Sequence, residues 1–157
     1  MKFFLCIFVT AIFINISNAS NRKATELEVS NKETVIAFIE ETVFIIKEHS
    51  GYALAHPGDL DNSIRHLEHT CHAINPNLVK KRPMPAPDIG LIKALEFFFD
   101  KTVVEPQQFY KELLYITENS INICKLNLYS NNLHELSNLA KYINFQYDKF
   151  YKILKNE

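Results

Sequence analysis

The sequence predicts an all-α protein: a single-domain helical bundle of four to five helices that follows an N-terminal signal peptide. Three observations support this fold class. Apolar residues recur at helical spacing in several segments, and no segment shows the alternating pattern and glycine-rich turns of a β-hairpin. Only 3 of the 157 residues are glycine, while 47% are hydrophobic, which is enough for a real core and argues against disorder.

Residues 1–19, MKFFLCIFVTAIFINISNA, have the features of a secretory signal peptide. Lys2 gives a positive start, and the apolar run that follows is shorter than the roughly 20 residues that cross a bilayer. Ser17 and Ala19 are the small residues that a signal peptidase recognises. We therefore predict cleavage after Ala19, a secreted or periplasmic protein, and no stable membrane insertion after cleavage. The alternative is an uncleaved membrane anchor.

The first expected helix opens the bundle domain, residues 31–157. It follows a polar N-terminal segment, residues 20–30, that we predict to be flexible. Ser30 and Glu33 form a capping box, and apolar residues then keep helical spacing to about residue 49. Two glycines and a proline between residues 51 and 58 are expected to break the chain after this helix.

Capping residues and prolines predict the remaining helices. Asp and Asn side chains accept hydrogen bonds from the unpaired N–H groups at a helix start, and proline suits the first turn. The expected helices run from Asp59 or Asp61 to Asn75, from Ile89 to about Val103 after a cap at Asp88, from Pro106 to about Tyr129, and from the capping-box-like pair Asn132 and Glu135 into the C-terminal region.

The last of these helices carries the clearest apolar stripe. Its members repeat at alternating steps of four and three residues, which places them within an arc of roughly 80° and predicts a seam that packs in a bundle. They are Leu136, Ala140, Ile143, Tyr147, Phe150 and Leu154.

Two cysteines, Cys71 and Cys124, remain after the signal peptide has removed Cys6. An even pair in a chain bound for an oxidising compartment predicts a disulfide bond. The bond would close a loop of about 50 residues and stabilise the fold by about 4 kcal/mol. The alternative is two buried thiols that do not meet.

A histidine cluster, His66, His69 and His72, is the one local pattern that suggests chemistry, because closely spaced helical histidines can share a zinc ion. The apolar stripe of the same helix lies on the other side, so we expect the histidines on a solvated outer face. Along the axis His66 and His72 are about 9 Å apart, which is too far to converge easily on one ion. A metal site that uses these three residues and a pH-sensitive contact surface are the alternatives.

A proline-rich connector, residues 75–87, contains the basic triplet Lys80, Lys81 and Arg82. We expect it to span two helices at low entropic cost. Its alternative roles are a polyproline II segment that docks on an aromatic groove, a processing site or an electrostatic contact.

Three consecutive aromatic residues, Phe97, Phe98 and Phe99, span about 200° of the expected third helix and cannot all face one seam. We expect this helix to be buried on most sides. The alternative is that one ring faces a partner or lines a cavity for a small apolar ligand.

The residues favour binding over catalysis. The sequence contains no glycine-rich phosphate loop and no HExxH, GxSxG or CxxCH motif. A formal net charge of −1 gives no attraction to nucleic acid or to an anionic membrane surface. We therefore expect an exported binding protein without a cofactor that acts on a macromolecular partner, most simply another protein. A carrier of a small apolar ligand and a weak metal-binding protein are the alternatives.

Overall fold

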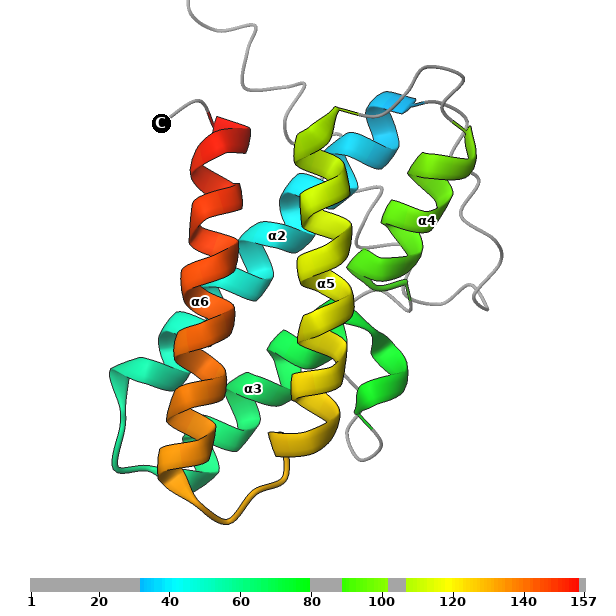
Figure 1. Cartoon of the computed structure of the whole chain (residues 1–157). Coiled ribbons are helices and arrows are strands. Elements are labelled where there is room, and N and C mark those ends of the chain that lie inside the picture. The colour runs from blue at the N-terminus through cyan, green and yellow to red at the C-terminus, as the bar shows by residue number, and fades with distance from the viewer. Residues whose placement is uncertain (1–31, 80–88, 102–106, 156–157) are drawn as a thin grey trace, which may run out of the picture.

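A computed structural model of the chain describes residues 32–79, 89–101 and 107–155 (Figure 1). This part of the chain contains α-helices and no strand, which confirms the predicted all-α bundle. The elements are α2 (Lys32–Ala55), α3 (Leu60–Ile74), the short 3₁₀ helix η2 (Pro76–Leu78), α4 (Leu91–Lys101), α5 (Gln108–Asn127) and α6 (Leu133–Lys155).

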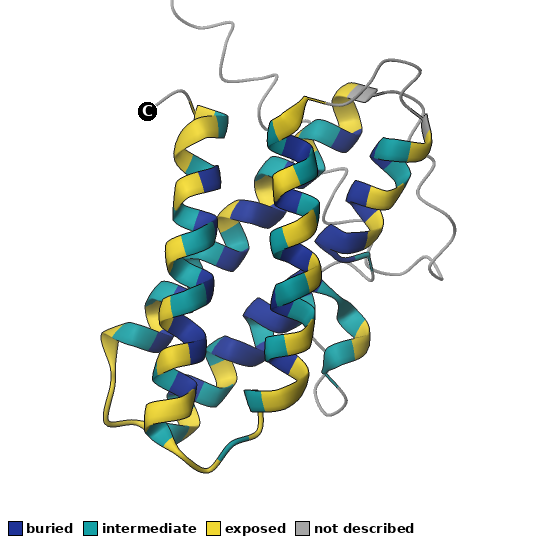
Figure 2. Cartoon of the chain, viewed as in Figure 1, coloured by how far each residue is buried: buried dark blue, intermediate teal, exposed yellow. Residues whose placement is uncertain are grey.

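The helix α2 packs most extensively against α6 and α3 and also contacts α4, while α3 contacts α2, α4, α5, α6 and η2. In Figure 1, α5 and α6 lie side by side, with α2 and α3 behind them. The buried positions of the helices face one another across the interior (Figure 2). The predicted stripe of α6 is confirmed as part of this core: five of its members are buried, namely Leu136, Ala140, Ile143, Tyr147 and Phe150.

The predicted disulfide is confirmed. Cys71 and Cys124 are bonded, with a Cα–Cα distance of 6.0 Å and a sequence separation of 53. The bond joins α3 to α5 in the core, where both cysteines are buried. It therefore ties α3, which carries His66, His69 and His72, to α5.

The end of α2 differs from the prediction. The helix does not break at Gly51 but continues to Ala55, and the turn that follows contains Pro57 and Gly58. A glycine inside a helix costs only about 1 kcal/mol, which packing can offset. Here α6 packs against this part of the helix: a Cβ at Gly51 would lie 3.4 Å from the Asn144 side-chain nitrogen, an ordinary contact distance.

Two of the predicted caps are present. The Asp59 side chain accepts a hydrogen bond from the Asn62 N–H at 2.9 Å and so begins α3. The Asn132 side chain accepts one from the His134 N–H, also at 2.9 Å, at the start of α6. These bonds satisfy N–H groups that have no partner within the helix.

The start of α4 is packed tightly against the end of α3. A Cβ on Gly90 would lie 2.6 Å from the Ile74 carbonyl oxygen and 2.9 Å from the Asn75 Cα, distances that real Cβ atoms do not reach. Only glycine fits this position. The chain that leaves α3 is thus brought back to it before α4 begins.

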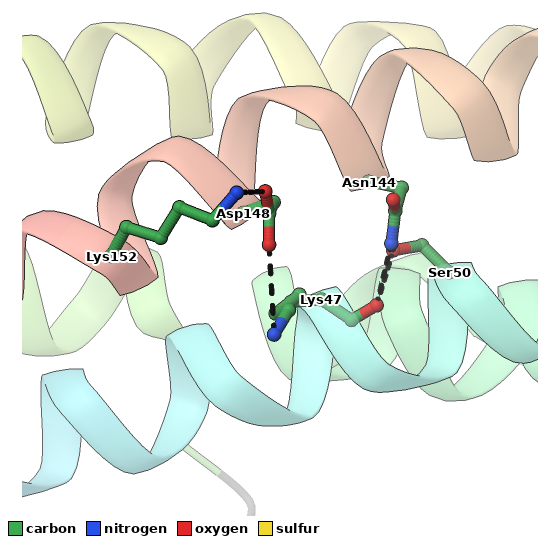
Figure 3. A network of polar contacts seen from close by, with 5 residues as sticks. All are labelled: Lys47, Ser50, Asn144, Asp148 and Lys152. Carbon is green, nitrogen blue, oxygen red and sulfur yellow. Dashed lines mark hydrogen bonds and ion pairs between the residues drawn. The ribbon is translucent and has the colours of Figure 1, made fainter. Parts of the chain in front are cut away.

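A polar network fixes α2 against α6 (Figure 3). The Asn144 side-chain nitrogen donates to the Lys47 carbonyl oxygen at 2.8 Å and approaches the Ser50 hydroxyl at 3.2 Å. Asp148 pairs with Lys47 at 3.6 Å and with Lys152 at 2.7 Å. We call these five residues the α2–α6 clamp. Because the clamp joins specific atoms of both helices, it sets their register.

Several predicted features lie outside the described residues. These are the signal peptide at residues 1–19, the N-terminal segment at residues 20–30, and Lys80, Lys81 and Arg82 of the proline-rich connector. Of the described helices, none combines the length and apolar character needed to span a bilayer.

Candidate metal centre

Three histidines meet at the interface of α2 and α3. His49 comes from α2, and His66 and His69 lie about one turn apart on α3. One possible ligand atom from each of the three lies within 4.8 Å of the others, and all three residues are half-buried. Among the described residues, this is the group that could hold a metal ion. We call it the histidine trio.

The contacts within the trio run through the Nδ1 atom of His49. This atom lies 3.2 Å from Nδ1 of His66 and 3.3 Å from Nδ1 of His69. The His49 ring centroid is 5.5 Å from that of His66 and 4.7 Å from that of His69. His49 is therefore the hub of the cluster.

Hydrogen bonding satisfies the two contacts of His49 only weakly. A ring nitrogen of neutral imidazole carries either one proton or one lone pair, so Nδ1 of His49 shares it between His66 and His69 in a three-centre hydrogen bond. A cation at the centre of the trio could instead accept a lone pair from each of the three nitrogens.

Two of the three nitrogen–nitrogen distances in the trio agree with those around a tetrahedral metal ion. With Zn–N bonds of about 2.0–2.1 Å, two ligands of a tetrahedral zinc ion are about 3.3 Å apart. The Nδ1–Nδ1 distances from His49 to His66 and to His69 are 3.2 and 3.3 Å, and the ligand atoms of His66 and His69 lie within 4.8 Å of each other.

The environment lowers the pKa of two members of the trio, His49 and His66, and so favours the neutral form that binds a metal. Burial, followed by the charges of His69 and His66, lowers the pKa of His49 to about 4, and the nearby Glu48 charge opposes this shift. The pKa of His66 is also lowered, first by burial and then by Arg65. Both imidazoles are therefore neutral at neutral pH, with lone pairs available for a metal.

A tyrosine and a glutamate border the trio. The Tyr52 ring centroid lies 5.7 Å from that of His49 and 5.3 Å from that of His66. The Tyr52 hydroxyl donates a 2.9 Å hydrogen bond to Oε1 of Glu48. Tyr52 is 44% exposed, so this pair lies at the solvent edge of the trio.

The trio corrects the expected placement of the histidines. His66 and His69 do not lie on a solvated outer face but are half-buried against α2. His72 is also half-buried, yet it does not belong to the trio. The structure therefore brings together two of the three predicted residues and adds His49, which the sequence pattern missed.

The signal that could have revealed His49 lies along the first helix. His49, Tyr52 and His56 stand at positions i, i+3 and i+7, which share one side of a helix. An aromatic and imidazole side on one helix, next in sequence to a histidine-bearing helix, indicates that the two sides face each other.

The three phenylalanines are only partly consistent with the expected burial. Phe98 is buried, at 3% exposure, and its ring lies 4.5 Å from that of Tyr110 between centroids. Phe97 and Phe99 are half-buried. An open depression of about 330 Å³ lies elsewhere, on α2 and α6, where its lining includes Phe44 and Tyr151. A small apolar ligand near the three phenylalanines stays a prediction.

Comparisons with known proteins give no assignment for this chain. No protein-family model matches it, and neither a search of curated proteins nor a search of solved structures finds a match. The functional argument therefore depends on the trio itself.

Proposed function

We propose that this protein is an exported metal-binding protein that holds a divalent transition-metal ion, with zinc the first candidate, between α2 and α3. The ligands are His49, His66 and His69. The observation that supports this most strongly is the pair of Nδ1 contacts at His49, 3.2 and 3.3 Å, which one imidazole nitrogen can satisfy only as a weak three-centre hydrogen bond.

The ligand type selects the class of metal. Neutral imidazole nitrogens suit Zn²⁺, Cu²⁺ and Ni²⁺, whereas Ca²⁺ and Mg²⁺ prefer oxygen ligands. The two nitrogen–nitrogen distances at His49 match those around a tetrahedral ion, which makes Zn²⁺ the first candidate before Cu²⁺, which prefers a tetragonal arrangement.

Both helices that carry the ligands are held from outside the trio. The α2–α6 clamp engages Lys47 and Ser50, which flank His49 in the sequence. The disulfide holds α3 at Cys71, two residues after His69. Ligands on rigid elements lose little conformational entropy when the ion binds, and this supports a preorganised site.

Export is part of the proposal. The signal-like residues 1–19 and the disulfide are typical of a protein that folds in an oxidising compartment. The disulfide also keeps the two bonded cysteines from acting as thiolate ligands, so the histidines are left to define the site.

The test is a zinc titration of the mature protein. Isothermal calorimetry measures the affinity, and native mass spectrometry measures the number of ions bound. We expect one Zn²⁺ per chain. The variants His49→Gln, His66→Gln and His69→Gln should each weaken binding at least about tenfold, because each removes one ligand. His72→Gln should leave zinc binding unchanged, because His72 belongs to the histidine pattern of the sequence but not to the trio.

An exposed histidine, His134 at the start of α6, provides the matched control, and His134→Gln should leave binding unchanged. Two results would contradict the proposal: a wild-type protein that takes up no zinc, or a His49→Gln variant that binds zinc as tightly as wild type. Co-purified metal in protein from its own host would add direct support.

A second function, binding to a macromolecular partner, is favoured by exposed apolar side chains on α5 and α6. Tyr115 is 64% exposed, Leu126 81% and Phe145 72%. A photo-crosslinking residue at position 145 should give one defined adduct in the host, and the same residue at position 134 should give none. Equal labelling at both positions would count against a specific partner.

A further inference from the structure

We infer that a depression between α2 and α6 binds a basic side chain, lysine or arginine, of a partner protein, in the position that the chain's own Lys155 occupies. The depression has a volume of about 330 Å³, and its lining includes Glu40, Glu41 and Phe44 of α2 and Tyr151 and Lys155 of α6. We call it the α2–α6 depression. This inference does not depend on the metal site, which lies between α2 and α3.

Two aromatic rings form the apolar part of the depression. The ring centroids of Phe44 and Tyr151 lie 5.5 Å apart, with an angle of 41° between the ring planes. Phe44 is 37% exposed, so its ring is open to another molecule. The faces of aromatic rings carry partial negative charge and attract cations. The pair therefore suits both the apolar stem and the charged end of a basic side chain.

The chain itself shows which chemical group this surface accepts. The Nζ atom of Lys155 lies 3.5 Å from Oε2 of Glu40 and 6.0 Å from the Tyr151 ring centroid. The Nζ atom of Lys47 lies over the same ring, 4.4 Å from its centroid. A carboxylate and an aromatic face thus hold an ammonium group here together. A basic side chain of another protein would meet the same two groups.

Of these two lysines, Lys155 is the one that a competing cation can displace. It is the last residue of α6, and its side chain is 43% exposed. The Lys47 side chain is 31% exposed and is held by Asp148 in the α2–α6 clamp. Exposed ion pairs such as that of Lys155 contribute little to stability. Exchange of Lys155 for a partner's basic side chain therefore costs the fold little.

The charges that line the depression favour a further cation. Two carboxylates, Glu40 and Glu41, and one ammonium group, that of Lys155, leave one negative charge in balance. Glu41 is exposed, and in the described part of the chain no ion pair uses its carboxylate. Phe44 lies three residues further along α2, on the same side of the helix. A basic side chain that lies against Phe44 therefore brings its charge within reach of Glu41.

The shape of the depression favours a side chain carried by a protein over a free small amine. Pockets for small molecules enclose most of the ligand surface, whereas this depression is open. An open site covers one side of a ligand, so most of the affinity must come from contacts around it. A basic residue in a protein interface gains those contacts from its neighbours, and arginine is enriched in such interfaces.

The test is an NMR titration of the mature protein with short capped peptides. Acetyl-Gly-Arg-Gly-amide and acetyl-Gly-Lys-Gly-amide carry one basic side chain each, and acetyl-Gly-Gln-Gly-amide is the neutral comparison. We expect both basic peptides to shift the backbone amide signals of Phe44 and Tyr151 in a saturable way, and the neutral peptide to leave them unchanged. The shifts should be the same with zinc as with a chelator, which separates this site from the metal site.

Two variants test the roles of the charges, each with a matched control on α5. Glu41→Gln should weaken binding of the arginine peptide about three- to fivefold, because it removes a carboxylate of the site. Glu118→Gln removes the same charge from an exposed position on α5 and should leave the affinity unchanged. Lys155→Met should strengthen binding about two- to fivefold, because it removes the internal competitor. Lys125→Met, also exposed on α5, should not.

Three results would overturn the inference. The first is an equal response to the basic and the neutral peptides, or no saturable shift at Phe44 and Tyr151 with either basic peptide. The second is an equal loss of affinity in Glu41→Gln and Glu118→Gln, because the attraction would then come from the overall charge of the protein. The third is a Lys155→Met variant that binds no more tightly than Lys125→Met, because the peptide would then not take the position of Lys155. Glu41 and Lys155 are both exposed, so we expect these variants to fold as wild type does.

Discussion

One turn of α2 makes two interfaces of different character. Toward α6, the clamp pairs donors with acceptors: the Asn144 amide donates to the Lys47 carbonyl, and Asp148 meets two lysines. Toward α3, His49 meets two groups of its own kind through one nitrogen. The first interface pairs its donors and acceptors within the chain, whereas the proposed metal ion would complete the second.

Polar contacts between helices differ in their effect on stability. A contact in which every donor has an acceptor contributes to stability and to register. A contact between like groups costs stability unless a bound ion interacts favourably with both of them. The contact of like groups at His49 is therefore the feature on which the proposed metal site rests, and the matched contact beside it sets the register of α2 and α6.

The largest expected effect comes from removing the disulfide that anchors α3. The double variant Cys71→Ser with Cys124→Ser should lose about 4 kcal/mol of unfolding free energy, because the 53-residue loop gains freedom in the unfolded chain. Denaturant unfolding measures this loss. Hydrogen exchange should show that α3 loses more protection than α6, and equal losses would show that the histidine interface does not depend on this anchor.

The second effect is stabilisation by zinc. At a free concentration of 100 times Kd, Zn²⁺ should raise the unfolding free energy by about 2.7 kcal/mol, because it binds the folded state. His49→Gln should abolish this increase. Thermal unfolding with zinc and with a chelator measures it, and a zinc effect that persists in His49→Gln would place the metal elsewhere.

The third change breaks the matched interface. Asn144→Ala removes the amide that bonds Lys47 and Ser50 and should cost about 1–2 kcal/mol in the absence of metal. The increment that zinc adds should stay close to that of wild type, since α3 and its ligands are untouched. A variant that folds normally but gains nothing from zinc would show that the clamp itself positions His49.

A smaller effect is the pH dependence of the unfolding free energy, measured on metal-free protein with chelator present. The two interfaces should lose stability in different pH ranges. The pKa of folded His49 is about 4, below the usual 6.5, so the unfolded chain binds more protons between these values. Stability should therefore be highest above pH 6.5 and fall as the pH is lowered toward 4. Solvent screening of a half-buried group limits the size of this fall.

The control for this pH profile is His49→Gln, which should show a shallower decrease over the same range. The clamp responds at lower pH, because the hydrogen bond from Lys152 lowers the pKa of Asp148 below 3.8. Its contribution is present above pH 3.8 and is lost as the pH falls through the folded value. If wild type and His49→Gln lost stability equally between pH 6.5 and 4, the loss would not come from His49.

The smallest expected effect is a gain. Gly51→Ala should raise the unfolding free energy by about 0.5–1 kcal/mol, because glycine is costly inside a helix and the new methyl group fits at 3.4 Å from Asn144. Denaturant unfolding measures it. A loss instead of a gain would show that the clamp requires the closer approach that glycine permits.

Much of the fold follows from the sequence because its signals are local. Caps such as Asp59 and Asn132 and the stripe of α6 depend on residues within a few turns of one another. The disulfide follows from the number of cysteines and the expected compartment. The error at Gly51 has a tertiary cause, since α6 packs against that glycine and holds the helix together.

The site was only half predictable for the same reason. His66 and His69 are neighbours on one helix, but His49 lies 17 and 20 residues from them in sequence. The three histidines meet only because of the way α2 and α3 are aligned. The residue pattern within either helix does not predict that alignment. The sequence therefore predicts that the polar side of α3 faces solvent, although His49 and Tyr52 of α2 cover it.

The close contact of Gly90 with the end of α3 has a practical use, because it indicates where the chain can be lengthened. Since the fold itself holds the two ends of the intervening segment together, lengthening that segment adds only about 0.6 kcal/mol per doubling. Residues 80–88 are thus the natural place to insert an affinity tag, a fluorescent reporter or new chain termini. Such insertions would leave the covalent path between His49 and His69 uninterrupted and would permit labelled protein for each measurement above.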